Sequence, residues 1–176
     1  MGLILATDGF EDSELSYPYY RLQEADVEVN LATPNGDSIV GKHEYEFEAD
    51  FAIDDHDADW WADEYDILVI PGGKSPEMLR IQAPTAAEIV DAFDTNGLPI
   101  ASICHGAQLL ISADILDDRT LTGYWTLEID IENAGGTYVD EAVVIDDNLV
   151  TSRVPSDLPA FMRETINLLE TADIPA

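Results

Sequence analysis

Basic residues and cysteine are scarce in this chain. Its 176 residues include 7 Lys and Arg against 37 Asp and Glu, which gives a formal net charge of −30 at pH 7, and one cysteine, Cys104. A charge of this sign and size repels nucleic-acid phosphates and anionic membrane surfaces, so we expect neither as a partner. One cysteine permits no disulfide within the chain, which is typical of a reducing compartment and leaves the thiol available for chemistry.

Long apolar runs are missing as well. No stretch approaches the ~18 apolar residues of a membrane-spanning helix. Met1 leads directly into the strand-like run Gly2–Thr7 without a basic flank, so the pattern of a secretory signal peptide is absent. We therefore expect a cytoplasmic protein.

Acidic residues are spread throughout a sequence of which 46% is hydrophobic. Self-repulsion destabilises a compact state of this charge unless ions screen it. The composition resembles that of proteins from salt-in halophiles, so we interpret the charge as a sign of habitat and not of activity. The acidic run Asp54–Asp59 lacks the glycine-turned spacing of a calcium loop, and no cluster of Cys and His at zinc-ligand spacing surrounds Cys104. We expect no metal and no other cofactor.

Strand-like and helix-like segments alternate along the chain, whose length suits one α/β domain over residues 1–176. The alternation predicts a doubly wound, mostly parallel sheet with helices on both faces. The predicted strands are Leu3–Thr7, Val27–Ala32, Ile67–Ile70, Pro99–Ile103, Ala142–Ile145 and Leu149–Ser152, with a loose β-hairpin over Asp37–Phe51. The predicted helices are Asp12–Ala25, Pro84–Thr95, Gly106–Ser112, Trp125–Asn133 and a last one around Phe161, Met162, Ile166 and Leu169.

Cys104 lies where the buried strand Pro99–Ile103 should turn into a helix. Ser102 precedes it by two residues and Gly106 follows it by two, which is the small-x-nucleophile-x-small spacing of a nucleophile elbow. The start of a helix lowers the pKa of a thiol through its unpaired N–H groups and its dipole, so we expect this pKa to be low. The pattern predicts that Cys104 is a nucleophile.

Ligands of such sheets bind beyond the carboxyl ends of the strands, where three loops of this chain should meet: Asp8–Asp12, Pro71–Glu77 and Cys104–Gly106. Glu11 is either an acid or base beside the thiol or a helix N-cap. Gly72 and Gly73 either form a tight turn or let a backbone N–H, with that of His105, stabilise an oxyanion. His105 is not automatically the base for its neighbour.

Two other histidines, His43 and His56, are predicted to lie on the surface. No histidine follows position 105. A class I glutamine amidotransferase needs a triad histidine well downstream of its cysteine, so this activity is not expected.

Several motifs together resemble the ThiJ/PfpI superfamily, and in particular its PfpI-type intracellular proteases. They are Phe10-Glu11-Asp12, Tyr17-Pro18-Tyr19, Gly41-Lys42-His43, Pro71-Gly72-Gly73 with Pro76-Glu77, Ala101-Ser102-Ile103-Cys104-His105-Gly106, and Ser152-Arg153-Val154-Pro155 with Asp157-Leu158. The resemblance covers nearly the whole chain. It departs from the common pattern at Ala107, where relatives often have proline.

The resemblance implies a flavodoxin-like fold with Cys104 as nucleophile and His105 beside it. It implies that Glu11 is hydrogen-bonded to the thiol and that the N–H groups of Gly73 and His105 form an oxyanion hole. It also implies dimers that assemble into hexameric rings, in which Glu77 reaches His105 of a neighbouring subunit.

Aromatic residues raise two further expectations. We expect Gly72, Tyr124 and Trp125 to line the pocket, with the two aromatic residues at its rim. Trp60 and Trp61 belong either to a subunit interface or to helix-on-sheet packing.

Three functions remain open from the sequence. The leading prediction is a cysteine-dependent hydrolase that cleaves small peptides. The alternative is a glyoxalase or deglycase that acts on methylglyoxal or its adducts, since both activities need the same nucleophile and oxyanion hole. The third is a stress protein without enzymatic activity, in which oxidation of Cys104 senses redox state.

Overall fold

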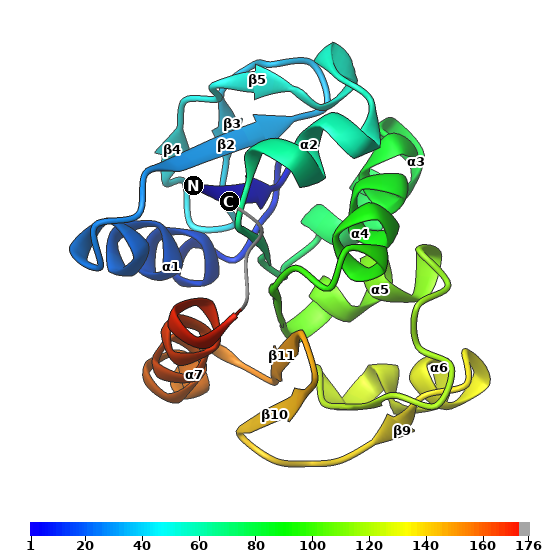
Figure 1. Cartoon of the computed structure of the whole chain (residues 1–176). Helices are drawn as coiled ribbons and strands as arrows, with labels where there is room; N and C mark the ends of the chain where they lie inside the picture. Colours follow the sequence, from blue (N-terminus) through cyan, green and yellow to red (C-terminus); the bar gives the residue numbers. More distant parts are fainter. Residues whose placement is uncertain (173–176) are drawn as a thin grey trace.

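A central seven-stranded sheet organises the structure, a computed structural model that describes residues 1–172 (Figure 1). The strand order is β10-β11-β7-β6-β1-β2-β5, and every neighbouring pair is parallel except β10 with β11. The strands are β1 (Gly2–Leu5), β2 (Val29–Thr33), β5 (Phe51–Ala52), β6 (Ile67–Ile70), β7 (Ile100–Ile103), β10 (Val143–Asp146) and β11 (Leu149–Ser152). The predicted doubly wound, mostly parallel sheet is confirmed.

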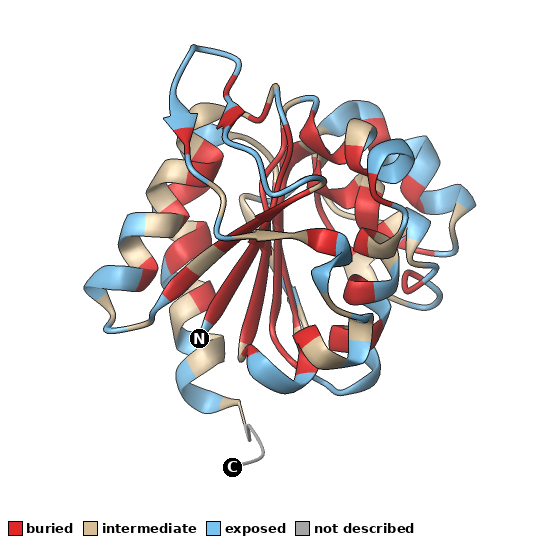
Figure 2. Cartoon of the chain, turned by 90° about the horizontal axis from the view of Figure 1, so that it is seen from above, coloured by how far each residue is buried: buried red, intermediate tan, exposed pale blue. Residues whose placement is uncertain are grey.

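Helices cover both faces of this sheet, and the buried residues gather between the layers (Figure 2). One face packs against α1 (Asp12–Glu24) and α7 (Leu158–Thr171), which contribute Leu15, Leu22, Phe161 and Met162. The other face packs against α2 (Ala58–Glu64), α3 (Ser75–Gln82), α4 (Thr85–Thr95), α5 (Ala107–Ser112) and α6 (Glu128–Asn133). The central strands are therefore apolar on both sides, as buried parallel strands must be.

Two small sheets lie outside the main one. The predicted hairpin over 37–51 exists as β3 (Ile39–Val40) and β4 (Glu46–Phe47), which pair antiparallel. The strands β8 (Thr120–Leu121) and β9 (Thr137–Tyr138) pair in parallel and were not predicted. Two residues a strand give no readable alternation, so sequence periodicity cannot reveal them.

Two helices, α2 and α3, are not among those predicted from the sequence. The segment after Pro71-Gly72-Gly73 was expected to be a loop, but α3 begins at Ser75 with a proline in its first turn, where a missing N–H costs nothing. Asp57 caps α2 by accepting a hydrogen bond from the Trp60 N–H at 3.0 Å, so an N-cap signal was present. Within residues 1–172, no helix is both long and apolar enough to span a bilayer.

The order of the strands fixes where a ligand site can form. β1 lies between β2 and β6, so the chain leaves β1 toward one edge of the sheet and later returns to build the other. The loops that follow β1 and β6 diverge at this switch point and leave a crevice. They are tied together there, because the Lys74 N–H donates to the Gly9 carbonyl at 2.8 Å and the Glu11 N–H to the Gly72 carbonyl at 3.3 Å.

Candidate active site

The turn after β7 has the geometry of a nucleophile elbow. Cys104 has φ +60°, a left-handed conformation that costs a non-glycine residue energy and is typical of functional sites. Gly106 has no room for a side chain, since a Cβ there would lie 2.5 Å from Ser102 Oγ and 2.6 Å from the Ile70 carbonyl oxygen. The small residues predicted around Cys104 therefore serve a steric need, and the cysteine is presented at the carboxyl end of the sheet.

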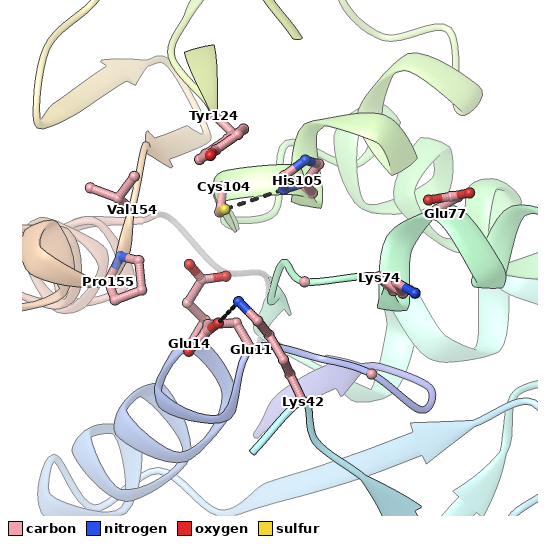
Figure 3. A pocket seen from close by; sticks show the side chains of 12 residues that line it. Glu11, Glu14, Lys42, Lys74, Glu77, Cys104, His105, Tyr124, Val154 and Pro155 are labelled. Atoms are coloured by element: carbon pink, nitrogen blue, oxygen red, sulfur yellow. Dashed lines mark hydrogen bonds and ion pairs between the residues drawn. The ribbon is translucent and has the colours of Figure 1, made fainter. Parts of the chain in front are cut away.

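Cys104 opens into a cavity of about 680 Å³ (Figure 3). The loops after β1, β6 and β7 contribute to its wall, as predicted. The β3–β4 hairpin and the segment after β11 contribute as well. The lining residues are Gly9, Glu11, Glu14, Lys42, Gly73, Lys74, Glu77, Cys104, His105, Tyr124, Val154 and Pro155.

The environment of Cys104 raises its pKa above that of a free thiol. Burial is the largest cause, and the negative charge of Glu14 raises the pKa further. The backbone N–H groups of His105 and Gly73 act in the opposite direction. The prediction of a low thiol pKa is wrong in its net direction, because the contribution of the N–H groups is smaller than that of desolvation.

Glu14 is the carboxyl group beside the thiol, and it is not among the site residues predicted from the sequence. It is fully buried on the first turns of α1 and accepts a hydrogen bond at 2.9 Å from the Gly72 N–H. Burial raises the pKa of Glu14 to about 8, although the hydrogen bonds from Gly72 and Cys104 lower it. Its Oε1 is buried and has no hydrogen-bond partner among residues 1–172. At neutral pH this carboxyl is protonated and able to donate.

Glu11 occupies a different place from the one that the resemblance implied. It lines the cavity, but its carboxylate accepts a hydrogen bond from Lys42 Nζ at 3.2 Å and lies 3.7 Å from His43 Nε2. It stands at the N-cap position of α1 without a side-chain capping bond. The prediction that Glu11 bonds to the thiol is corrected, because Glu14, three residues later, holds that position.

The imidazole of His105 lies beside the thiol of Cys104. Its Nδ1 lies 3.4 Å from Cys104 Sγ (Figure 3). Burial lowers the pKa of His105, and the charge of Glu77 opposes this effect. The imidazole is therefore neutral at pH 7 and able to accept a proton.

Tyr124 holds the His105 ring in place. The two rings stack with centroids 4.6 Å apart, and the Tyr124 N–H donates to the Cys104 carbonyl at 3.0 Å. Tyr124 lines the cavity as predicted, whereas Trp125 does not belong to the lining. Trp125 is 58% exposed and packs on the outer side of Tyr124, with centroids 3.9 Å apart.

Gly72 and Gly73 fill different roles at the floor of the cavity. A Cβ on Gly72 would lie 2.5 Å from Glu14 Oε2 and 2.8 Å from Cys104 Cβ, so Gly72 lies between these residues and not in the lining. Gly73 does line the cavity, with φ +73°. The absence of a side chain at both positions lets the loop after β6 approach the thiol.

The remaining candidate residues are not part of the cavity lining: His43, His56, Trp60 and Trp61. His43 is exposed, and together with Glu11 and Asp12 it forms a cluster of possible metal ligands. Both Asp12 carboxylate oxygens already accept backbone N–H groups, from His43 at 2.8 Å and Tyr45 at 2.9 Å, so this side chain holds the hairpin. His56 stacks on Trp60 with centroids 3.5 Å apart. Trp61 is fully buried in the core, in line with helix-on-sheet packing.

Comparison with known proteins gives one consistent result. A model of the DJ-1/PfpI family matches residues 2–168. The chain is 46% identical over 167 residues to Deglycase TK1284 of Thermococcus kodakarensis, covering 95% of this chain and 98% of that one. It is 45% identical over 168 residues to Deglycase PfpI of Pyrococcus furiosus, covering 96% and 98%.

A solved structure agrees with these relatives. A two-domain protein from Anabaena variabilis, which contains DJ-1/ThiJ/PfpI-like and ferritin-like domains, superimposes with a TM-score of 0.90 at 33% identity. The match covers 99% of this chain and 52% of that protein. The buried Cys104 in its elbow and the names of the relatives indicate a cysteine-dependent enzyme. The chain belongs to the DJ-1/PfpI family.

Proposed function

We propose that this enzyme is a deglycase, which converts methylglyoxal into lactate. From an adduct with an amine or thiol, the amine or thiol is released as the aldehyde re-forms, and the aldehyde then reacts in the same way. The observation that carries the proposal is the placement of Cys104 between a neutral imidazole and a protonated buried carboxyl. Several relatives are named deglycases and one, from Bacillus subtilis, is named a putative cysteine protease, so the names support a deglycase more than a peptidase. We therefore place the deglycase ahead of the peptidase that the sequence analysis favoured.

The first step follows from the position of His105. As Sγ of Cys104 adds to the aldehyde carbon, the thiol proton passes to His105 Nδ1, and the carbonyl electrons move to oxygen. The N–H groups of Gly73 and His105, which already stabilise negative charge at the sulfur, are the candidate donors to that oxyanion. Return of the proton from His105 to the oxygen gives a neutral hemithioacetal.

The second step needs a group that moves a proton between adjacent carbons. In the fraction of the enzyme in which Glu14 is ionised, its carboxylate removes the proton from the former aldehyde carbon to give an enediolate. Glu14 then returns that proton to the neighbouring carbon, and the hydroxyl proton moves to the other oxygen, which gives the thioester of lactate. Water hydrolyses the thioester to lactate and restores the thiol, so no external oxidant or reductant is needed. A carboxyl with a pKa of about 8 is suited to both giving and taking this proton near neutral pH.

The test compares two carboxyl groups of the same cavity. Lactate formation from methylglyoxal is measured for wild type, Glu14→Gln and the matched variant Glu11→Gln, with cleavage of a fluorogenic peptide in parallel. We expect Glu14→Gln to lose roughly 10²- to 10⁴-fold in kcat, as for removal of a general acid or base, and Glu11→Gln to lose far less. Peptide cleavage without lactate formation would overturn the proposal in favour of a peptidase, and silence in both assays would favour the redox sensor.

We further infer that Glu77 serves His105 of a partner subunit, as the resemblance implies. Glu77 is exposed on α3 and lines the cavity, and its carboxylate has no hydrogen-bond or ion-pair partner among residues 1–172. Its carboxylate is therefore available to a second copy of the chain. Mixing Cys104→Ser with Glu77→Gln should restore part of the activity, because one mixed site then holds both groups.

The matched control for this mixing experiment is Cys104→Ser with His105→Ala. These two residues belong to one elbow, and no subunit in the mixture carries both of them intact. We therefore expect this mixture to remain inactive. Equal activity in the two mixtures would refute a shared site. A fully active monomer in gel filtration would refute it as well.

A further inference from the structure

The two lysines of this chain, Lys42 and Lys74, both line the Cys104 cavity. They come from separate parts of the sequence, one from the β3–β4 hairpin and the other from the loop before α3. None of the five arginines lies in the cavity wall formed by residues 1–172. A chain with 37 acidic residues thus has both of its lysines in the wall of the cavity that contains Cys104.

The charge balance of the cavity differs from that of the whole chain. Three carboxyl groups line it, those of Glu11, Glu14 and Glu77. Burial keeps Glu14 protonated at neutral pH, since its pKa is about 8. Two formal negative charges then face two ammonium groups, so the cavity is close to neutral in a protein of net charge −30.

The two lysines are not equally engaged. Lys42 donates to Glu11 Oε2 at 3.2 Å, and the negative charge of Glu11 raises its pKa, so the ammonium form is secured (Figure 3). Lys74 forms no ion pair with any residue between 1 and 172. Its backbone N–H is bound to the Gly9 carbonyl, and its stem lies close to Gly9. Its ammonium group can therefore bind an anion without first breaking an ion pair.

We propose that Lys74, assisted by Lys42, binds an anionic group of the substrate, so that the enzyme favours carbonyl compounds that carry a carboxylate. This inference rests on the proposed function and names the substrate class of the same site. Distant acidic residues repel such a substrate at low salt. Near 1 M salt the screening length is about 3 Å, which removes the distant repulsion and leaves direct contact with the ammonium groups in force.

The test uses two alkylating agents of nearly the same shape, iodoacetate and iodoacetamide, which differ in charge. Each forms a bond from Sγ to its methylene carbon and releases iodide, while the thiol proton passes to buffer. Cys104 is the only cysteine, so intact mass reports the reaction at this residue alone. The rate ratio of iodoacetate to iodoacetamide is normalised to the same ratio for N-acetylcysteine at one fixed KCl concentration.

We expect the normalised rate ratio to be at least about three in wild type and one or below in Lys74→Gln. A difference of this size is consistent with the ~0.5–1 kcal/mol of a screened ion contact. Arg163→Gln is the matched control, because it removes one positive charge from an exposed position of α7 outside the cavity. A wild-type ratio of one or less, or equal ratios in Lys74→Gln and wild type, would overturn the proposal.

Lys42 requires a second control, because removing it leaves Glu11 without its partner. If Lys42 binds the anion, the ratio falls in both Lys42→Gln and the double variant Lys42→Gln/Glu11→Gln. Recovery of the wild-type ratio in the double variant would show that Lys42 only neutralises Glu11, and would overturn its part in the proposal. Circular dichroism of each variant confirms the fold.

Turnover gives an independent measurement. Methylglyoxal and 4,5-dioxopentanoate share the 2-oxoaldehyde group, and only the second carries a carboxylate. We expect Lys74→Gln to raise the KM for 4,5-dioxopentanoate several-fold more than that for methylglyoxal. Loss of the alkylation preference overturns the anion site even where methylglyoxal is turned over. A preserved alkylation preference without turnover of either compound supports the anion site and overturns the proposed function.

Discussion

Two polar clusters lie at opposite ends of the central sheet, and their hydrogen bonding differs. At the start of β7 and β11, Arg119 donates to the Asn148 side chain at 2.9 Å and to the Asp146 carbonyl at 3.0 Å, and it pairs with Asp94. Asn148 in turn donates to the Leu98 carbonyl at 3.0 Å. Each group in this cluster meets a partner of opposite charge or complementary polarity.

The cluster at the carboxyl end of β7 contains groups in energetically unfavourable environments. Cys104 has a strained backbone and a raised pKa, Glu14 is buried with an unpaired oxygen, and His105 has a lowered pKa. Both clusters are largely buried, so burial alone does not separate function from structure. What separates them is whether the polar groups are satisfied, because unsatisfied groups retain free energy for binding and proton transfer.

The sharpest test of this comparison is Cys104→Ser. We expect a loss of activity on the order of 10³-fold or more, as for other covalent nucleophiles, with no loss of thermal stability. Lactate formation and the melting temperature in molar KCl are measured together. Retained turnover would remove Cys104 from the mechanism.

The burial of Glu14 should also make the free energy of unfolding depend on pH. Its folded pKa, about 8, exceeds the ordinary value of 4.5, so the folded state holds a proton that the unfolded state releases between these values. Stability from this group is therefore present below pH 4.5 and falls as pH rises toward 8, by ~3–5 kcal/mol. Urea unfolding from pH 5 to 9 should show the decline in wild type and a flatter profile in Glu14→Gln; parallel profiles would contradict it.

A substitution in the Arg119 cluster should lower stability and leave activity unchanged, which is the opposite of the result expected for Cys104→Ser. Arg119→Met leaves Asp94 and Asp146 without their cation, so we expect a loss of about 2 kcal/mol, below the range for fully buried pairs since Arg119 is 17% exposed. The kcat for methylglyoxal should be unchanged. A fall in kcat in a variant that remains folded would mean that the two ends of the sheet are coupled.

Salt should change the repulsion among the surface acidic residues more than it changes the ion pairs of the Arg119 cluster. Raising KCl from 0.1 to 2 M should stabilise wild type by at least ~1 kcal/mol, a rise of roughly 2–4 °C in melting temperature for a chain of this length. The penalty of Arg119→Met should persist in 2 M KCl, because close and largely buried pairs are screened less. A melting temperature that does not change with salt would refute the halophile interpretation.

Much of the fold could be predicted from the sequence because its signals are local. The apolar runs around Ile67–Ile70 and Ile100–Ile103 predicted buried strands, and the strands lie within one residue of the predicted bounds. The helix α3 was missed because Pro76 follows a Gly-Gly turn, and such a turn also suits a loop. The short strands β8 and β9 are held by their neighbours and not by their own pattern.

Some features of the site could likewise be predicted from the sequence, whereas others depend on tertiary packing. Residue types and spacing by themselves determined the sheet, the elbow around Cys104 and the loops that meet there, because steric limits and apolar periodicity act over a few residues. Glu11 and Glu14 are separated by less than one helical turn, and both face the cavity. Only the tertiary structure decided that Glu14 meets the thiol while Glu11 meets Lys42. That choice depends on how α1, the β3–β4 hairpin and the loop after β6 pack together, and burial in that packing sets the proton affinities of the site.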